Sequence, residues 1–112
     1  TPFIDAYAAR SHVFLEAYAT APICAPSRSA LATGVYASSL GTQNLRSEVS
    51  IPAAIEPMVS VLRKHGYWTA LRGKTDYNFS PAGLFDLHAE LTEPWERRPA
   101  DRPFFAFVNL GS

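Results

Sequence analysis

Residues 104–108, Phe-Phe-Ala-Phe-Val, are apolar at every position, and this run limits the possible folds more than any other part of the sequence. A strand without polar positions is typical of a central strand in a parallel sheet that is covered on both faces. Residues 67–71 indicate a second strand, which directly follows the clearest predicted helix, residues 54–65. The apolar face of that helix has helical spacing and is formed by Ile55, Met58, Val59 and Leu62. This alternation predicts an α/β fold built in layers.

The remaining segments extend the same alternation. Thr1 and Pro2 suit the N-cap and the first position of a short helix, because proline lacks an N–H group that a helix start leaves unpaired anyway. The expected order is completed by a strand over 12–18, a helix over 26–33, an irregular stretch over 35–50 and a proline-rich, charged surface excursion over 80–103.

Length and charge exclude several classes of protein. The 112 residues allow at most one domain. Ten basic and ten acidic side chains give no net charge, so nothing favours a nucleic acid or an anionic membrane as partner. The apolar runs are far shorter than a membrane-spanning segment requires. Because the chain lacks an initiator methionine and ends directly after an apolar strand, we expect it to be a fragment of a longer protein.

Cys24 is the only cysteine of the chain, so it cannot form an internal disulfide. Pro26 suits the start of the predicted helix and Gly34 suits its end. Cys24 would then face unpaired N–H groups, with Arg28 one turn along, an arrangement that suits phosphate or sulfate. The residues alone leave two interpretations open: a nucleophile beside an oxyanion pocket, or a small buried cysteine before a helix.

The order of the residues around Cys24 resembles the signature of the type I sulfatases. The positions in register are Cys24, Pro26, Ser27, Arg28, Leu31, Thr33 and Gly34. In that family the cysteine is oxidised to formylglycine by a maturation enzyme that reads this signature. Residues 1–5, 66–74 and 103–109 are also similar to family segments. The resemblance implies that residues 1–112 are part of an N-terminal catalytic sulfatase domain, incomplete at both ends, with an alkaline-phosphatase-like sandwich whose mostly parallel sheet is flanked by helices.

The resemblance also implies site roles. Hydrated formylglycine at position 24 would attack the sulfur of a sulfate ester, and Arg28 and Lys74 would neutralise the sulfate oxygens. A divalent cation, Ca²⁺ or else Mg²⁺, would bind the formylglycine, with its other ligands outside this sequence. Lys74 follows the strand over 67–71 at its carboxyl end, where open α/β sheets bind ligands. From the residues alone, an exposed loop lysine is the alternative.

Two positions depart from the common family pattern. Most members have histidine where this chain has Asp76. An ionised aspartate has no proton to donate. Aspartate could act as an acid only if burial raised its pKa enough to keep it protonated. The run from Lys74 resembles a variant in bacterial enzymes that act on sulfated glycans, so we expect Asp76 to bind substrate. A family histidine near residues 38–41 is missing as well. Gln43 and Asn44 are the candidates to supply amide contacts instead; the alternative is a polar surface loop.

Three function classes stay open. The first is a sulfatase fragment that cleaves sulfate esters of a sulfated glycan or an aryl or alkyl sulfate. The second is a phosphonate or phosphate monoester hydrolase of the same superfamily, and the third is a sulfatase-like binding protein without catalysis. The expected partners are the sulfated substrate and the maturation enzyme, and the resemblance suggests a periplasmic or secreted location. We expect the fragment alone to be inactive.

Overall fold

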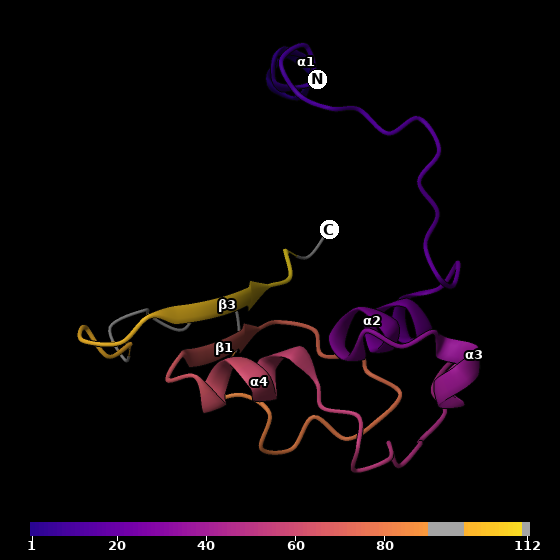
Figure 1. Cartoon of the computed structure of the whole chain (residues 1–112), viewed down its shortest axis with the longest axis vertical. Helices are drawn as coiled ribbons and strands as arrows, with labels where there is room; N and C mark the ends of the chain where they lie inside the picture. Colours follow the sequence, from indigo (N-terminus) through magenta and orange to yellow (C-terminus); the bar gives the residue numbers. More distant parts are fainter. Residues whose placement is uncertain (90–97, 111–112) are drawn as a thin grey trace.

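The computed structural model describes residues 1–89 and 98–110 of the chain (Figure 1). Its elements follow in the order α1 Pro2–Ala8, α2 Cys24–Thr33, α3 Ala37–Leu40, α4 Met58–Lys64, β1 Trp68–Arg72, β2 Leu87–Ala89 and β3 Phe104–Val108. No helix in this described part has both the length and the apolar character needed to cross a membrane. Figure 1 shows α1 standing apart from the sheet, at the end of an extended segment that leads to α2.

The described strands form one sheet in the order β2-β1-β3, and both pairs are parallel. The register between β1 and β3 runs from Trp68 opposite Phe104 to Arg72 opposite Val108, so both strands end at the same edge. The predicted α/β fold is therefore confirmed. The expectation that residues 104–108 form a central strand is wrong for the described residues, because β1 lies in the middle and is buried at every position.

Helix α4 packs beside the sheet, and α2 packs against α4. Helix α4 contacts β1, and α2 contacts both α3 and α4 (Figure 1). Small side chains let α2 approach its neighbours closely, since Ala25 and Ser29 are completely buried. The larger apolar side chains that are buried include Val59 on α4, Trp68 and Leu71 on β1, and Phe79 in the loop after β1.

The boundaries of two predicted helices need correction. Helix α4 begins at Met58 and not at residue 54, because Pro57 disfavours helical backbone at the residue before it and is itself the N-cap. Helix α2 begins at Cys24, two residues earlier than predicted. Pro26 remains compatible with that start, because the first N–H groups of a helix have no partner within the helix.

Three other predictions also need correction. Residues 12–18 do not form a strand: they are extended, and Phe14 and Leu15 are largely exposed, because no neighbouring strand pairs with them in the described structure. The stretch predicted as irregular contains α3, which ends at Gly41 in left-handed backbone with φ 79°. The predicted surface excursion contains β2, and its residues 90–97 lie outside the described residues.

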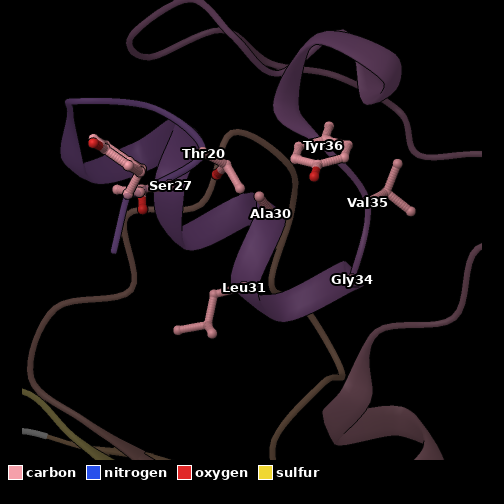
Figure 2. A pocket seen from close by; sticks show the side chains of 9 residues that line it. Thr20, Ser27, Ala30, Leu31, Gly34, Val35 and Tyr36 are labelled. Atoms are coloured by element: carbon pink, nitrogen blue, oxygen red, sulfur yellow. The ribbon is translucent and has the colours of Figure 1, made fainter. Parts of the chain in front are cut away.

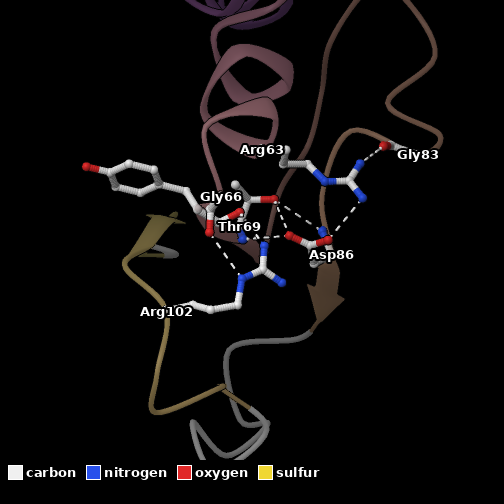
Figure 3. Close-up of polar contacts among 7 residues, drawn as sticks. Arg63, Gly66, Thr69, Gly83, Asp86 and Arg102 are labelled. Carbon is white, nitrogen blue, oxygen red and sulfur yellow. Dashed lines mark hydrogen bonds and ion pairs between the residues drawn. The ribbon is translucent and has the colours of Figure 1, made fainter.

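The amino end of β1 is held by a separate polar cluster, which Figure 3 shows. The backbone N–H and hydroxyl of Thr69 donate to Asp86 Oδ2 at 2.8 and 3.0 Å, and Asp86 also forms an ion pair with Arg63 at 3.0 Å. Arg63 donates to the Gly83 carbonyl as well, and Arg102 donates to the Gly66 carbonyl. This cluster ties the loop before β2 to the start of β1.

Asn78 connects the loop after β1 to the loop after α3. Its side chain is 1% exposed, and its Nδ2 donates to the carbonyls of Thr42 and Asn44, each at 2.7 Å. Its backbone N–H donates to the hydroxyl of Ser29 on α2 at 3.0 Å. Because Asn78 Oδ1 has no partner among the described residues, the side chain acts through its amide donors alone.

We predict that Asn78→Ala lowers the free energy of unfolding by about 2 kcal/mol, because the buried Thr42 carbonyl loses its side-chain donor. The Asn44 carbonyl also loses this donor but keeps its hydrogen bonds from Ser47. Chemical denaturation of the purified protein measures this. Asn44→Ala is the matched control: the described contacts of Asn44 use its backbone carbonyl, so removing its exposed side chain should change stability by no more than about 0.5 kcal/mol. Equal stability of the Asn78→Ala variant and the wild type would contradict this account of the loop.

Candidate active site

Cys24 is the first residue of α2, and its thiol is free and exposed. The N-cap residue is Ile23, which has no side-chain oxygen to satisfy the N–H groups of the first turn. These groups and the helix dipole therefore give the space around Cys24 a positive potential. Of the two interpretations open from the sequence, the packed cysteine is excluded by this exposure.

Lys74 and Asp76 lie just beyond the carboxyl end of β1, where the sequence placed Lys74. Lys74 Nζ and Asp76 Oδ2 form an ion pair at 2.8 Å. The hydrogen bond from Lys74 is the main cause that lowers the pKa of Asp76, and a hydrogen bond with Cys24 is the second. The pKa of Lys74 is raised, first by its hydrogen bond with Asp76 and also by Cys24. The three side chains thus act on one another at one place.

The lowered pKa of Asp76 bears on whether this residue can donate a proton in place of the family histidine. Its carboxyl group is ionised at neutral pH, so it cannot donate a proton to a leaving group. Burial does oppose ionisation here, but the hydrogen bonds from Lys74 and Cys24 outweigh it. The backbone of Asp76 has φ 47°, a left-handed conformation that aspartate tolerates better than most residues.

Arg28 joins α2 to the end of the sheet. Its Nε donates to the Thr75 carbonyl at 2.8 Å, one terminal nitrogen donates to the Lys74 carbonyl at 2.8 Å, and the other donates to Asn109 Oδ1 at 2.7 Å. The guanidinium also lies over the Tyr77 ring, 5.7 Å from its centroid. These contacts use three of the roughly five N–H donors of the guanidinium, so within the described residues two donors stay available to an anion.

Asn109 was not among the site residues predicted from the sequence. It follows β3, at the same edge of the sheet as Lys74, and its Nδ2 donates to the Lys74 carbonyl at 2.7 Å. The signal that could have found it was present, because two parallel strands that end together bring the residues after them side by side.

Gln43 and Asn44 are the sequence candidates that the structure does not bring to Cys24. Both are exposed in the loop after α3. What the structure shows for Asn44 is a backbone contact, since its carbonyl accepts a hydrogen bond from Asn78. Their suggested amide contacts to substrate therefore stay a prediction.

An open hollow of about 410 Å³ lies beside Cys24 and is lined also by Ile23, Ser27 and Arg28. A second hollow of about 460 Å³ lies along α2 and includes Leu31, Val35 and Tyr36 (Figure 2). The second hollow has no acidic or basic side chain in its lining, whereas the first contains the thiol and Arg28. Of these two hollows, the one beside Cys24 therefore has the groups that suit an anionic substrate.

The described residues do not by themselves fit a Ca²⁺ site. Calcium takes about six to eight oxygen ligands, and within residues 1–89 and 98–110 no group of three or more His, Cys, Asp or Glu side chains could hold a metal ion. Asp76 offers a carboxylate next to Cys24, but Lys74 already pairs with it.

Comparison with known proteins identifies the family. The sequence model of the Sulfatase family matches residues 1–110. The chain is 34% identical to an ulvan-active sulfatase of Formosa agariphila, over 98% of this chain and 20% of that protein. It is 35% identical to an N-acetylgalactosamine-6-O-sulfatase of Bacteroides thetaiotaomicron, over 82% of this chain and 19% of that protein. It is 36% identical to arylsulfatase K of Rattus norvegicus, over 69% of this chain and 13% of that protein.

The chain thus spans no more than 20% of the length of these curated relatives. No solved structure matches it. The family match covers nearly every residue, including Cys24, Arg28, Lys74 and Asp76, which the fold brings together. The chain therefore belongs to the sulfatase family, with the α/β architecture of the alkaline-phosphatase-like superfamily.

Proposed function

We propose that the protein hydrolyses sulfate esters and that residues 1–112 belong to the N-terminal part of its catalytic domain. The observation that carries this proposal is the meeting of Cys24, at the start of α2, with Lys74 and Asp76, beyond the end of β1. A nucleophile position, a lysine and a helix N-terminus at one place suit a tetrahedral anion. The sulfatase relatives support the same chemistry.

The proposed nucleophile is formylglycine made from Cys24. One hydroxyl of its hydrate would lose its proton to solvent and bond to the ester sulfur as the bond from sulfur to the alcohol oxygen breaks. The second hydroxyl would then lose its proton to solvent, and the bond between the carbon and the sulfated oxygen would break, which releases sulfate and restores the aldehyde. Lys74 would offset the charge on the sulfate oxygens, helped by the free donors of Arg28. Because Asp76 is ionised, the proton for the leaving alcohol must come from solvent or from another group.

A divalent cation, Ca²⁺ or Mg²⁺, is part of this proposal. When bound, such an ion polarises an ester oxygen as a Lewis acid. Formylglycine at position 24 would supply one ligand. The described residues do not complete a site. We propose that the remaining oxygen ligands come from other parts of the full-length protein.

We propose a sulfated glycan as the substrate. The names of two relatives support this choice, since one is an ulvan-active sulfatase and another an N-acetylgalactosamine-6-O-sulfatase. The ionised carboxylate of Asp76 would accept hydrogen bonds from sugar hydroxyls next to the sulfate. Gln43 and Asn44 would offer amide contacts to the same substrate if the exposed loop after α3 approaches it.

We predict that Cys24→Ala abolishes turnover of an aryl sulfate in the full-length protein, because the nucleophile is lost. Peptide mass spectrometry of the wild type, produced in a host with a working maturation system, should show loss of sulfur at Cys24 and an aldehyde that reacts with a hydrazine. An unmodified thiol together with wild-type turnover in the Cys24→Ala variant would disprove the proposed nucleophile.

We predict that Lys74→Ala lowers kcat by about 100- to 1,000-fold, which is typical for losing one group that stabilises developing charge. The fold should persist, because the Lys74 side chain is 55% exposed. Lys64→Ala is the matched control: Lys64 is also exposed and paired with a carboxylate, that of Glu56, but it lies on α4. Steady-state kinetics with matched circular dichroism measures both variants, and unchanged kinetics for Lys74→Ala would remove it from the site.

The ion pair also predicts a pH dependence. The pKa of Asp76 lies below its ordinary 3.8, so the pair stabilises the folded state above that pH and this contribution is lost as the pH falls through the lowered pKa. Lys74→Met should therefore raise the pKa of Asp76, and NMR titration of ¹³C-labelled aspartate measures it. Lys64→Met should leave that pKa unchanged. An Asp76 pKa that is the same in Lys74→Met and in the wild type would rule out the pairing.

A further inference from the structure

The turn that carries Lys74 and Asp76 has a backbone that needs outside support. Gly73 has φ 79° and Asp76 has φ 47°, so two of its residues are in left-handed backbone. Such conformations cost energy outside glycine and persist only when neighbouring groups hold them. Glycine at position 73 also permits alternatives, because it adopts positive and negative φ about equally well. The position of the Lys74 ammonium group therefore depends on the neighbouring groups that form hydrogen bonds with this turn.

The turn is held at two carbonyls, those of Thr75 and Lys74. The Thr75 carbonyl accepts a hydrogen bond from Arg28 alone. The Lys74 carbonyl accepts one hydrogen bond from Asn109 Nδ2 at 2.7 Å and another from Arg28 at 2.8 Å. A carbonyl oxygen has two lone pairs, so these two donors satisfy it fully. The two donors come from different elements, one after β3 and one on α2.

Asn109 fits this place through both ends of its amide. Its backbone N–H donates to the Arg72 carbonyl at 3.0 Å, and Nδ2 lies 3.3 Å from the same oxygen. Its Oδ1 accepts the hydrogen bond from Arg28 at 2.7 Å. Asn109 is therefore the one described side chain that touches both the guanidinium of Arg28 and the Lys74 carbonyl.

We propose that Asn109 is a positioning residue for sulfate-ester cleavage, which holds the Lys74 turn and the Arg28 guanidinium in register with the nucleophile at position 24. This inference rests on the proposed function, because register matters only where Lys74 acts on the sulfate. Asn109 does not touch the reacting atoms in this role. Its effect reaches the site through the Lys74 carbonyl and Arg28.

The test compares Asn109→Ala and Asn109→Asp in the full-length protein, with 4-nitrophenyl sulfate as the substrate. Aspartate keeps an oxygen for Arg28 and the backbone N–H to the Arg72 carbonyl, but it loses the side-chain N–H donors to the Arg72 and Lys74 carbonyls. Both variants should lower kcat about 10- to 100-fold, because small displacements of a charged group cost that much. KM should change by less, about threefold at most, because Lys74 and Arg28 still attract the anion.

Thr69→Val is the matched structural control. It removes the buried hydroxyl that binds Asp86 at the amino end of β1 (Figure 3). Lys74 follows the opposite, carboxyl end of that strand. It should lower the unfolding midpoint but leave kcat within about twofold of the wild type. If folded Asn109→Ala also keeps kcat within about twofold, Asn109 is only structural and the proposal is wrong.

A second readout separates this proposal from the proposed function. NMR titration of Asp76 needs no activity, and Asn109→Ala should raise the pKa of Asp76 toward 3.8, because Lys74 is no longer held beside it. If the wild type cleaves no sulfate ester, the proposed function fails, and this shift shows whether Asn109 still positions Lys74. An unchanged pKa of Asp76 in the Asn109→Ala variant would overturn the positioning role.

Discussion

The arrangement of the site depends on the hydrogen bonds that the guanidinium of Arg28 donates. The guanidinium connects α2 to the carbonyls of Lys74 and Thr75, which lie 46 and 47 residues later, and to Asn109, 81 residues later. Hydrogen bonds from a charged donor are roughly twice as strong as neutral ones. These hydrogen bonds join α2, which begins at Cys24, to the turn after β1 that carries Lys74. Helix α2 is also joined to the loop after β1 by the Ser29 hydroxyl, which accepts a hydrogen bond from the backbone N–H of Asn78.

The electrostatics of the site follow from this packing. The Arg28 side chain brings positive charge to the edge of the sheet, and Lys74 adds a second cation, while Asp76 offsets part of it. An incoming anion must therefore share Lys74 with Asp76, and both remain ionised because each favours the charged form of the other. An aspartate in this place suits recognition of hydroxyl groups, and not proton donation.

Local patterns were sufficient for the elements whose structure depends on neighbours in sequence. The strands over 68–72 and 104–108, and the end of α2 at Gly34, were found within one or two residues because apolar runs and glycine act locally. Residues 12–18 were wrongly predicted as a strand, since a strand needs a partner and its apolar residues alone do not supply one. The three-residue β2 was missed because its pairing with β1 defines it more than its own composition does.

The sequence by itself determined the family and the parallel α/β class, and it predicted Cys24, Arg28, Lys74 and Asp76 as site residues, because the signature and the strand ends are local features. Only the tertiary structure decided that Arg28 holds the Lys74 turn, that Asp76 is ionised and that Asn109 completes the network. These are contacts between residues far apart in the chain. Their strength depends on distances and burial, which packing sets and residue order alone does not reveal.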